Sequence, residues 1–413
     1  MDYVTKIFSE RYIAFFLILV ILIIVGIFFI FTQKSTSLPQ KNIDFIEEKF
    51  SSPTTTDTEP QKSTFQPPEI IKAVYLTSWL AANPKVVDYV VNIAKNTEIN
   101  AVVVDVKDWS GFIAYNTDIP EAAEYGAERI LIPDIEAFLE RFHKEGIYVI
   151  ARITVFQDPV LARARPNLAV HRKSNKSLLW LDNVGLAWID PAAKAAWDYN
   201  IAVAKDAVGQ GFDEINFDYV RFPSDGDLKD MSFSFWDEKT SKHLVIREFF
   251  KYLREELPDA KLSIDFFGLT TVSSNDLGVG QVIEDAFEYF DYVCPMVYPS
   301  HYADGFLGYQ NPADYPYEVI KYSMESALRR LLIYNQLQRT PASTDEEIIK
   351  QKRNIQLRPW LQDFDLGAIY DAKMVRSEIE AVYDATGDNF RGFMLWNSLN
   401  VYTKEALQPA GLE

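Results

Sequence analysis

Eight short apolar runs, separated by stretches with helical patterning, follow one another from residue 69 to the end of the chain. The runs lie at 71–77, 100–106, 147–153, 214–220, 261–267, 291–298, 356–362 and 391–396. The helical stretches lie at 84–96, 133–145, 192–208, 240–256, 280–289, 316–332 and 373–385. Strands that alternate with helices in this way favour a parallel sheet. Eight such units over about 340 residues predict an α/β fold, a (β/α)8 TIM barrel with long loops.

A doubly wound parallel sheet is the alternative architecture for such a pattern. It would normally carry a glycine-rich phosphate-binding turn after its first strand. The corresponding turn here, "LTSWLAANP" (76–84), contains no glycine. The sequence also lacks a phosphate-binding P-loop and the G-x-S-x-G signature of α/β-hydrolases. The barrel is therefore the preferred interpretation.

The first 68 residues differ in composition from the rest of the chain. Residues 13–31, "IAFFLILVILIIVGIFFIF", carry no charge and are long enough to cross a bilayer. No small-residue cleavage site follows, so we expect an uncleaved transmembrane anchor after a short cytoplasmic tail (1–12). Residues 32–68 are rich in Ser, Thr and Pro and are expected to form a flexible linker. The barrel domain, 69–413, is then expected on the outer face of a bacterial cell membrane.

Charge and cysteine content exclude several functional classes. The net charge of −18 argues against binding to nucleic acid, and against a basic cleft built for acidic polymers. The single cysteine, Cys294, permits no internal disulfide and is typical of a small core residue. Four scattered His residues, with neither an H-E-x-x-H nor a C-x-x-C motif, argue against a dedicated zinc site.

Polar and aromatic side chains gather where the predicted strands end, which is where TIM barrels place their reacting groups. From the second run to the eighth these are Asp105, Lys107, Asp108, Trp109, Arg152, Asn216, Asp218, Tyr219, Arg221, Asp265, Tyr298, His301, Arg358, Trp360, Gln362, Asp363, Trp396 and Asn397. In "EINFDYV" (214–220), Asn216 and Asp218 share one face of the strand. A charge that faces a barrel interior is costly unless it is paired or used.

Two carboxylates at neighbouring strand ends suit glycoside hydrolysis, in which one carboxyl group is ionised and the other protonated. We expect Asp218 to be the nucleophile or base, with its charge maintained by Arg152 and Arg221. Asp265 is the favoured acid and Asp105 the competing candidate. The alternative for each carboxylate is a purely structural buried ion pair.

Further side chains are candidates for binding sugar. The predicted substrate-binding residues are Arg152, Asn216, Tyr219, Arg221, Tyr298, His301, Trp360, Gln362, Trp396, Lys107 and Trp109. Trp79, together with the other tryptophans and Tyr298, could stack on sugar rings. Any one of these aromatics, taken alone, is more often a core residue than a sugar-binding surface. Their recurrence at one end of the barrel favours a binding role.

Several stretches resemble a bacterial family of "putative glycosyl hydrolases". They are "AVVVDVKDWSG", "FDEINFDYVRFPSDG", "LSIDFFGLTT", "DYVCPMVYPSHY", "LRPWLQDF" and "GFMLWNSLN", and the resemblance spans about residues 70–405. The family is of TIM-barrel type and distantly similar to amylase-like glycosidases. The resemblance implies that Asp218 takes the place of the nucleophilic Asp after strand four. The chain departs from amylase-like enzymes where they carry an Arg two residues earlier, here Asn216, and an acidic Glu after strand five, here Asp265.

These observations lead to one expected function and two rivals. We expect a membrane-anchored glycoside hydrolase that acts on a cell-surface or cell-wall polysaccharide without a cofactor. One rival is a non-catalytic carbohydrate-binding barrel tethered to the membrane, which would need the aromatics but no acid. The other is a metal-dependent hydrolase, which would lose activity on chelation. The dense carboxylates could hold a cation such as Ca²⁺.

Overall fold

The computed structural model describes residues 67–339 and 355–411. The predicted tail (1–12) and membrane anchor (13–31), and the linker up to residue 66, lie outside the described residues. Within the described part of the chain, no helix combines the length and apolarity needed to cross a membrane.

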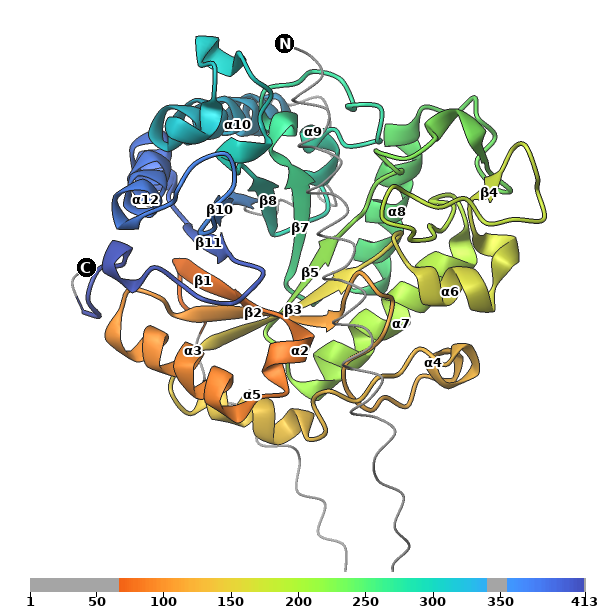
Figure 1. The fold of residues 1–413 in the computed structure, drawn as a ribbon, viewed down its shortest axis with the longest axis horizontal. Helices are drawn as coiled ribbons and strands as arrows, with labels where there is room; N and C mark the ends of the chain where they lie inside the picture. The colour runs from red at the N-terminus through yellow and green to blue at the C-terminus, as the bar shows by residue number, and fades with distance from the viewer. Residues whose placement is uncertain (1–66, 340–354, 412–413) are drawn as a thin grey trace, which may run out of the picture. The chain divides into compact units, whose positions relative to one another are not determined.

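A closed ring of parallel strands confirms the predicted (β/α)8 barrel (Figure 1). The strands are β1 (Ile71–Leu76), β2 (Ala101–Lys107), β3 (Tyr148–Thr154), β5 (Glu214–Asp218), β7 (Leu262–Phe267), β8 (Tyr292–Met296), β9 (Gln356–Leu357), β10 (Trp360–Gln362) and β11 (Gly392–Trp396). They are ordered β10-β11-β1-β2-β3-β5-β7-β8-β9, and β10 also pairs with β8, which closes the ring. The seventh predicted run, 356–362, is divided into β9 and β10 around Pro359.

Helices surround the strands on the outside of the ring (Figure 1). The longer ones are α3 (Pro84–Asn96), α5 (Ile135–His143), α7 (Lys194–Gln210), α8 (Lys242–Glu256), α10 (Pro316–Arg339) and α12 (Ala372–Thr386). Local sequence explains where α3 begins: the Asn83 side chain accepts a hydrogen bond from the backbone N–H of Lys85, and Pro84 occupies the first turn. The helix expected at 280–289 is only one turn, α9 (Ile283–Ala286).

The strands separate two apolar clusters, because alternate residues of a strand point to opposite faces. A large cluster, which includes Val74 and Val104, lies between the sheet and the helices. A smaller cluster fills the barrel interior with residues of the opposite parity, among them Ala73, Val103 and Met394. The interior is thus a packed core below the strand ends, and a site can form only above it.

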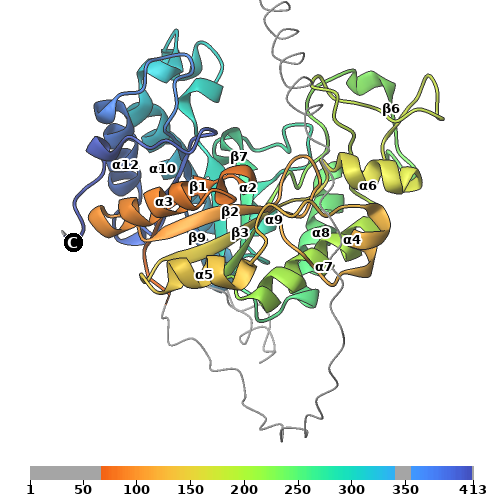
Figure 2. The ribbon, with the colours of Figure 1, turned by 60° about the horizontal axis from the view of Figure 1, so that its bottom comes forward.

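The loops after β3 and β5 together form a small two-stranded sheet outside the barrel (Figure 2). Its antiparallel strands, β4 (His171–Arg172) and β6 (Met231–Ser232), come from these two different loops. The Asp190 carboxylate accepts hydrogen bonds from the backbone N–H groups of Ser234, Phe235 and Trp236 at 2.7–3.1 Å. One buried carboxylate therefore ties the two loops together beside the barrel mouth.

Candidate active site

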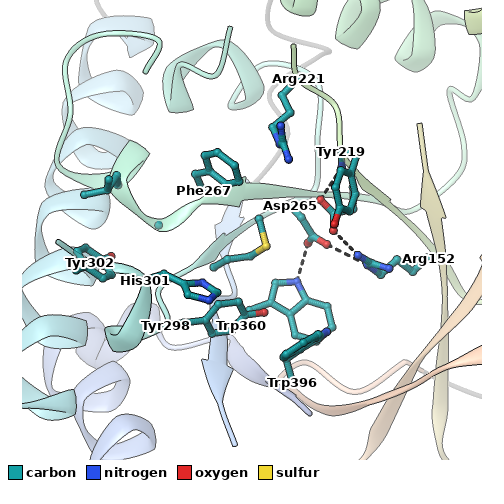
Figure 3. A pocket seen from close by; sticks show the side chains of 14 residues that line it. Arg152, Tyr219, Arg221, Asp265, Phe267, Tyr298, His301, Tyr302, Trp360 and Trp396 are labelled. Atoms are coloured by element: carbon teal, nitrogen blue, oxygen red, sulfur yellow. Dashed lines mark hydrogen bonds and ion pairs between the residues drawn. The ribbon is translucent and has the colours of Figure 1, made fainter. Parts of the chain in front are cut away.

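A cavity of about 480 Å³ opens at the carboxyl ends of the strands. It is lined by Arg152, Asp218, Tyr219, Arg221, Asp265, Phe267, Gly268, Leu269, Met296, Tyr298, His301, Tyr302, Trp360 and Trp396. These residues lie in or directly after β3, β5, β7, β8, β10 and β11. Charged groups occupy one part of the wall and aromatic rings most of the remainder (Figure 3).

The guanidinium of Arg152 contacts three carboxylates at once. Its Nη1 lies 2.6 Å from Asp105 Oδ1, Nη2 is bonded to Asp218 Oδ2, and Nε lies 3.6 Å from Asp265 Oδ2. The strands that carry these residues are adjacent or nearly so: β2, β3, β5 and β7 follow one another in the sheet. One buried cation therefore fixes the relative positions of all three candidate catalytic carboxylates.

Asp218 is the last residue of β5, and the chain bends sharply after it. Tyr219 has a φ of 54°, a left-handed conformation that is uncommon for a bulky residue. The bend brings the backbone N–H of Tyr219 back to donate a 2.5 Å hydrogen bond to Asp218 Oδ1. A non-glycine residue in this conformation is strained and persists only where the surrounding structure compensates the strain. Such residues concentrate at functional sites.

Asp265 lies in the cavity wall between Arg152 and Trp360 (Figure 3). Its Oδ1 accepts hydrogen bonds from Asn216 Nδ2 at 2.9 Å and from the indole N–H of Trp360 at 2.7 Å. Its Oδ2 is buried and has no hydrogen-bond partner among the described residues. Burial, and secondarily the charge of Asp218, raise the pKa of Asp265 to about 8 against the opposing effect of Arg152. Asp265 is therefore protonated at neutral pH.

Asp105, the competing candidate for the acid, does not line the cavity. Its Oδ2 accepts a hydrogen bond from the Tyr75 hydroxyl, and its Oδ1 is bonded to Arg152. Burial raises the pKa of this carboxyl group as well. Asp105 thus lies behind Arg152 and orients the guanidinium, and the geometry favours Asp265 as the acid.

Aromatic rings form the opposite wall. Tyr298 lies in edge contact with His301 at 5.2 Å between ring centroids, and 6.0 Å from Trp396. Trp396 in turn stacks on Tyr75 of β1 at 6.1 Å. Burial lowers the pKa of His301, so its imidazole is neutral at neutral pH. The wall is therefore uncharged and presents ring surfaces to the cavity.

Arg221 contributes to the site without a direct ion pair to Asp218. We expected it to share with Arg152 the task of keeping Asp218 ionised. The structure instead places its guanidinium over the rings of Phe267, Trp188 and Tyr219, at 4.6, 4.8 and 5.1 Å from the centroids. Among the described residues no carboxylate lies within 4.0 Å of it, so the charge of Asp218 acts on Arg221 only from a greater distance.

Three other predicted binding residues lie outside the cavity. The register of β2 shifts between Asp105 and Lys107, and the Lys107 amine forms a fully buried ion pair with Asp158 at 2.7 Å. Gln362 bonds to Ser300 and to the Phe364 carbonyl, so it holds loops in place. Trp109 is 49% exposed and does not line the cavity.

Asn216 also stays out of the cavity, since its amide supports Asp265 from behind. The predicted residues that the structure does bring together are Asp218, Asp265, Arg152, Tyr219, Arg221, Tyr298, His301, Trp360 and Trp396. Our sequence reasoning missed Phe267, Gly268, Leu269, Met296 and Tyr302. Strand parity could have identified two of these, because Phe267 shares a face with Asp265, and Met296 shares one with Tyr298.

Gly268 has a steric reason to be glycine. A Cβ atom there would lie 2.4 Å from the carbonyl oxygen of Met296 and 2.8 Å from the Tyr302 hydroxyl. The missing side chain lets the segment after β7 approach β8 closely and leaves the cavity open. Within the described residues, no group of three or more His, Cys, Asp or Glu side chains is placed to hold a metal ion.

Comparisons with known proteins agree with this architecture. A family model described as "Putative glycosyl hydrolase domain" matches residues 73–402. The glycoside hydrolase domain of PgaB (BpsB) from Bordetella bronchiseptica is 12% identical, with a TM-score of 0.53, over 81% of this chain and 95% of that one. At this identity the likeness concerns the fold alone.

A hypothetical protein from Ruminiclostridium thermocellum is 40% identical over 50% of this chain and 98% of that one, with a TM-score of 0.44. The glycoside hydrolase domain of PelA from Pseudomonas aeruginosa is 12% identical over 81% of this chain and 97% of that one, with a TM-score of 0.41. A search of curated proteins gives no match.

Proposed function

The chain belongs to the "putative glycosyl hydrolase domain" family, and from that premise we propose that it hydrolyses a cell-surface or cell-wall polysaccharide with two carboxyl groups, Asp218 and Asp265. The observation that carries the proposal is the contrast between these two side chains in one cavity. Asp218 is bonded to a guanidinium and a backbone N–H, whereas Asp265 is neutral at neutral pH. Glycosidases need one carboxyl group in each state.

Asp265 is the proposed general acid. Trp360 and Asn216 hold its Oδ1, and Oδ2, which has no hydrogen-bond partner among the described residues, is left to carry the proton. In the proposed step this proton passes to the glycosidic oxygen as its bond to the anomeric carbon breaks. Asp265 then becomes an anion 3.6 Å from Arg152 Nε, which stabilises the new charge.

Asp218 is the proposed nucleophile or base. Two donors, the Arg152 guanidinium and the Tyr219 backbone N–H, fix its carboxylate at the end of β5. From this position it either bonds to the anomeric carbon or takes a proton from water. Arg152 and Asp105 are positioning residues in this scheme, since Arg152 joins the carboxylates and Asp105 orients Arg152.

Aromatic surfaces supply the proposed sugar contacts. Tyr298 and Trp396 line the cavity across from the carboxyl groups, together with the neutral imidazole of His301. The faces of sugar rings are apolar, and they stack on aromatic rings while their hydroxyls bond to polar groups. The proposed reaction requires no cofactor.

The cellular setting is part of the proposal. The uncharged stretch at 13–31 supports a single membrane anchor, and the Ser/Thr/Pro-rich segment that follows supports a linker of considerable reach. An anchored hydrolase on the outer face of the membrane would meet surface and wall polysaccharides there.

Hydrolysis by matched variants tests the proposal. Full-length protein is incubated with a panel of bacterial wall and surface polysaccharides, and newly formed reducing ends are measured. We expect Asp218→Asn and Asp265→Asn each to lower kcat by roughly 10²–10⁴-fold, the usual contribution of a catalytic proton-transfer group. Asp304→Asn, an exposed carboxylate on the loop after β8, is the control and should be fully active.

Two outcomes would contradict the proposal. If both cavity variants keep wild-type turnover, the two carboxyl groups are not the catalytic pair. If the wild-type protein binds glycans from the panel but releases no reducing ends, the non-catalytic carbohydrate-binding barrel replaces the hydrolase.

A further inference from the structure

Arg221 is a buried cation in the cavity wall that the proposed catalysis does not use. The residue is only 7% exposed. Among its polar contacts, Nη1 donates to the carbonyl oxygen of Phe222 and to the Ser224 hydroxyl, both at 3.1 Å. Both acceptors are uncharged and belong to the segment that directly follows Arg221.

The other buried arginines are all neutralised. Four arginines are buried within the described part of the chain, and three of them form ion pairs. Arg152 pairs with Asp105 and Asp218, Arg254 with Asp291, and Arg358 with Glu214. Arg221 alone among these four has no carboxylate within 4.0 Å in the described residues.

A buried charge without a counter-ion in contact is costly, and the more distant charges of Asp218, Asp225 and Asp182 offset the cost of burying Arg221 only in part. Its presence at a cavity therefore calls for a partner that arrives from outside. Figure 3 shows the guanidinium of Arg221 directed from the rim toward the space beside Phe267 and Asp265. The rings of Phe267, Trp188 and Tyr219 surround it and keep its planar group in a fixed orientation. A guanidinium held in this way offers paired N–H donors to an incoming oxyanion.

We propose that Arg221 binds the carboxylate of an acidic sugar, so that the substrate is a glycan with a singly charged residue at or beside the bond that is cleaved. The proposal rests on the proposed function and names its substrate class. A uronic acid carries such a carboxylate.

Charge favours a carboxylate over other anions. One guanidinium neutralises one negative charge, whereas a phosphate monoester carries nearly two at neutral pH. Asp218 and Asp105 already surround Arg152, so no second cation of the cluster is available for the extra charge. The net charge of −18 also disfavours a densely anionic polymer. A sparsely charged glycan satisfies both conditions.

The competing explanation is structural, in which Arg221 only holds the segment 219–224 through Phe222 and Ser224. Binding measurements separate the two explanations. Full-length protein is titrated with D-glucuronate, its neutral methyl ester and D-glucose 6-phosphate, and Kd is taken from ligand-observed NMR. We expect glucuronate to bind wild-type protein at least about tenfold more tightly than either of the other two ligands, a difference of about 1.4 kcal/mol.

Variants assign that preference to one side chain. In Arg221→Gln the preference for glucuronate over its ester should disappear, and in Arg221→Lys, which keeps the charge without the paired donors, it should be reduced. Arg165→Gln is the matched control, because Arg165 also lies over an aromatic ring, 5.9 Å from the Tyr125 centroid, but outside the cavity. It should keep the full preference.

The results that would overturn the inference are distinct from those that would overturn the hydrolase. If wild-type protein binds glucuronate and its methyl ester equally, the carboxylate-binding inference is refuted. This result needs no variant, so it holds even if a variant fails to fold. Tighter binding of glucose 6-phosphate than of glucuronate refutes the carboxylate, and a preference that persists in Arg221→Gln refutes Arg221. Turnover of a neutral glycan in any of these cases leaves the proposed hydrolase intact.

Discussion

Asp218 and Asp265 carry identical side chains but lie in different surroundings. Asp218 meets a guanidinium and a backbone N–H at a strained bend. Asp265 lies deeper, accepts two neutral hydrogen bonds, and feels the negative charge of Asp218, so its carboxyl group retains a proton. A carboxyl group that keeps its proton beside a second acid is what the proposed general acid–base chemistry requires.

Arg152 is expected to matter for stability as well as for catalysis. Arg152→Met leaves three carboxyl groups buried around an apolar side chain, and breaking a buried pair on one side typically costs about 3–5 kcal/mol. Urea unfolding at pH 7 should show a loss of that size in the free energy of unfolding. Arg141→Met is the control, since its ion pairs with Asp88 and Glu145 lie at the surface, where solvent screens them, and their loss should change stability little. Equal, small losses in both variants would refute the central role of Arg152.

At the scale of elements, the strands were predictable and some connections were not. The run at 71–77 matches β1, and the run at 147–153 matches β3, because strands buried on both faces read as continuous apolar segments. The helix expected at 280–289 is limited to α9. Phe287 and Phe290, which follow it, are buried although they lie outside the helix, so their apolar side chains suggested a longer helix than the chain forms.

The candidate site shows the same division. The rule that reacting groups lie at strand ends was enough to select Arg152, Asp218 and Asp265. The same rule could not reveal the register shift in β2, after which the Lys107 amine pairs with Asp158. A one-residue irregularity of this kind does not change the pattern of apolar residues. It also could not show that Asp105 lies behind Arg152, since that depends on depth within the barrel.

Closure of the barrel depends on a glycine in β11. Gly392 has a φ of 104°, and a Cβ atom there would lie 1.7 Å from the carbonyl oxygen of Ile71 in the paired strand β1. We expect Gly392→Ala to prevent stable folding, measured as loss of the cooperative transition in circular dichroism. Gly209→Ala, in α7 with open space around it, should instead be neutral or stabilise by about 0.5–1 kcal/mol. A fully stable Gly392→Ala protein would contradict the argument for close approach.

At the scale of the whole molecule, a strongly acidic barrel is proposed to be tethered through residues 13–31. The full-length protein should sediment with membranes and resist extraction by high salt, because an apolar span is held by hydrophobic burial rather than by charge. Detergent should release it. The matched control is the chain without residues 1–31, which should remain in the supernatant. Release of the full-length protein by salt alone would contradict a membrane span.

The protonation state of Asp265 is the measurement that tests the central claim most directly, because it needs no knowledge of the substrate. Protein with ¹³Cγ-labelled aspartate is titrated from pH 5 to 9.5, and Asp265→Asn identifies the signal of Asp265 by its loss. The proton is bound below the folded-state pKa and released above it, so we predict that this signal moves from the protonated to the ionised position as the pH rises through about 8. A signal that is already ionised at pH 6 would show that Asp265 holds no proton to donate, and would refute the proposed division of roles between the two carboxyl groups.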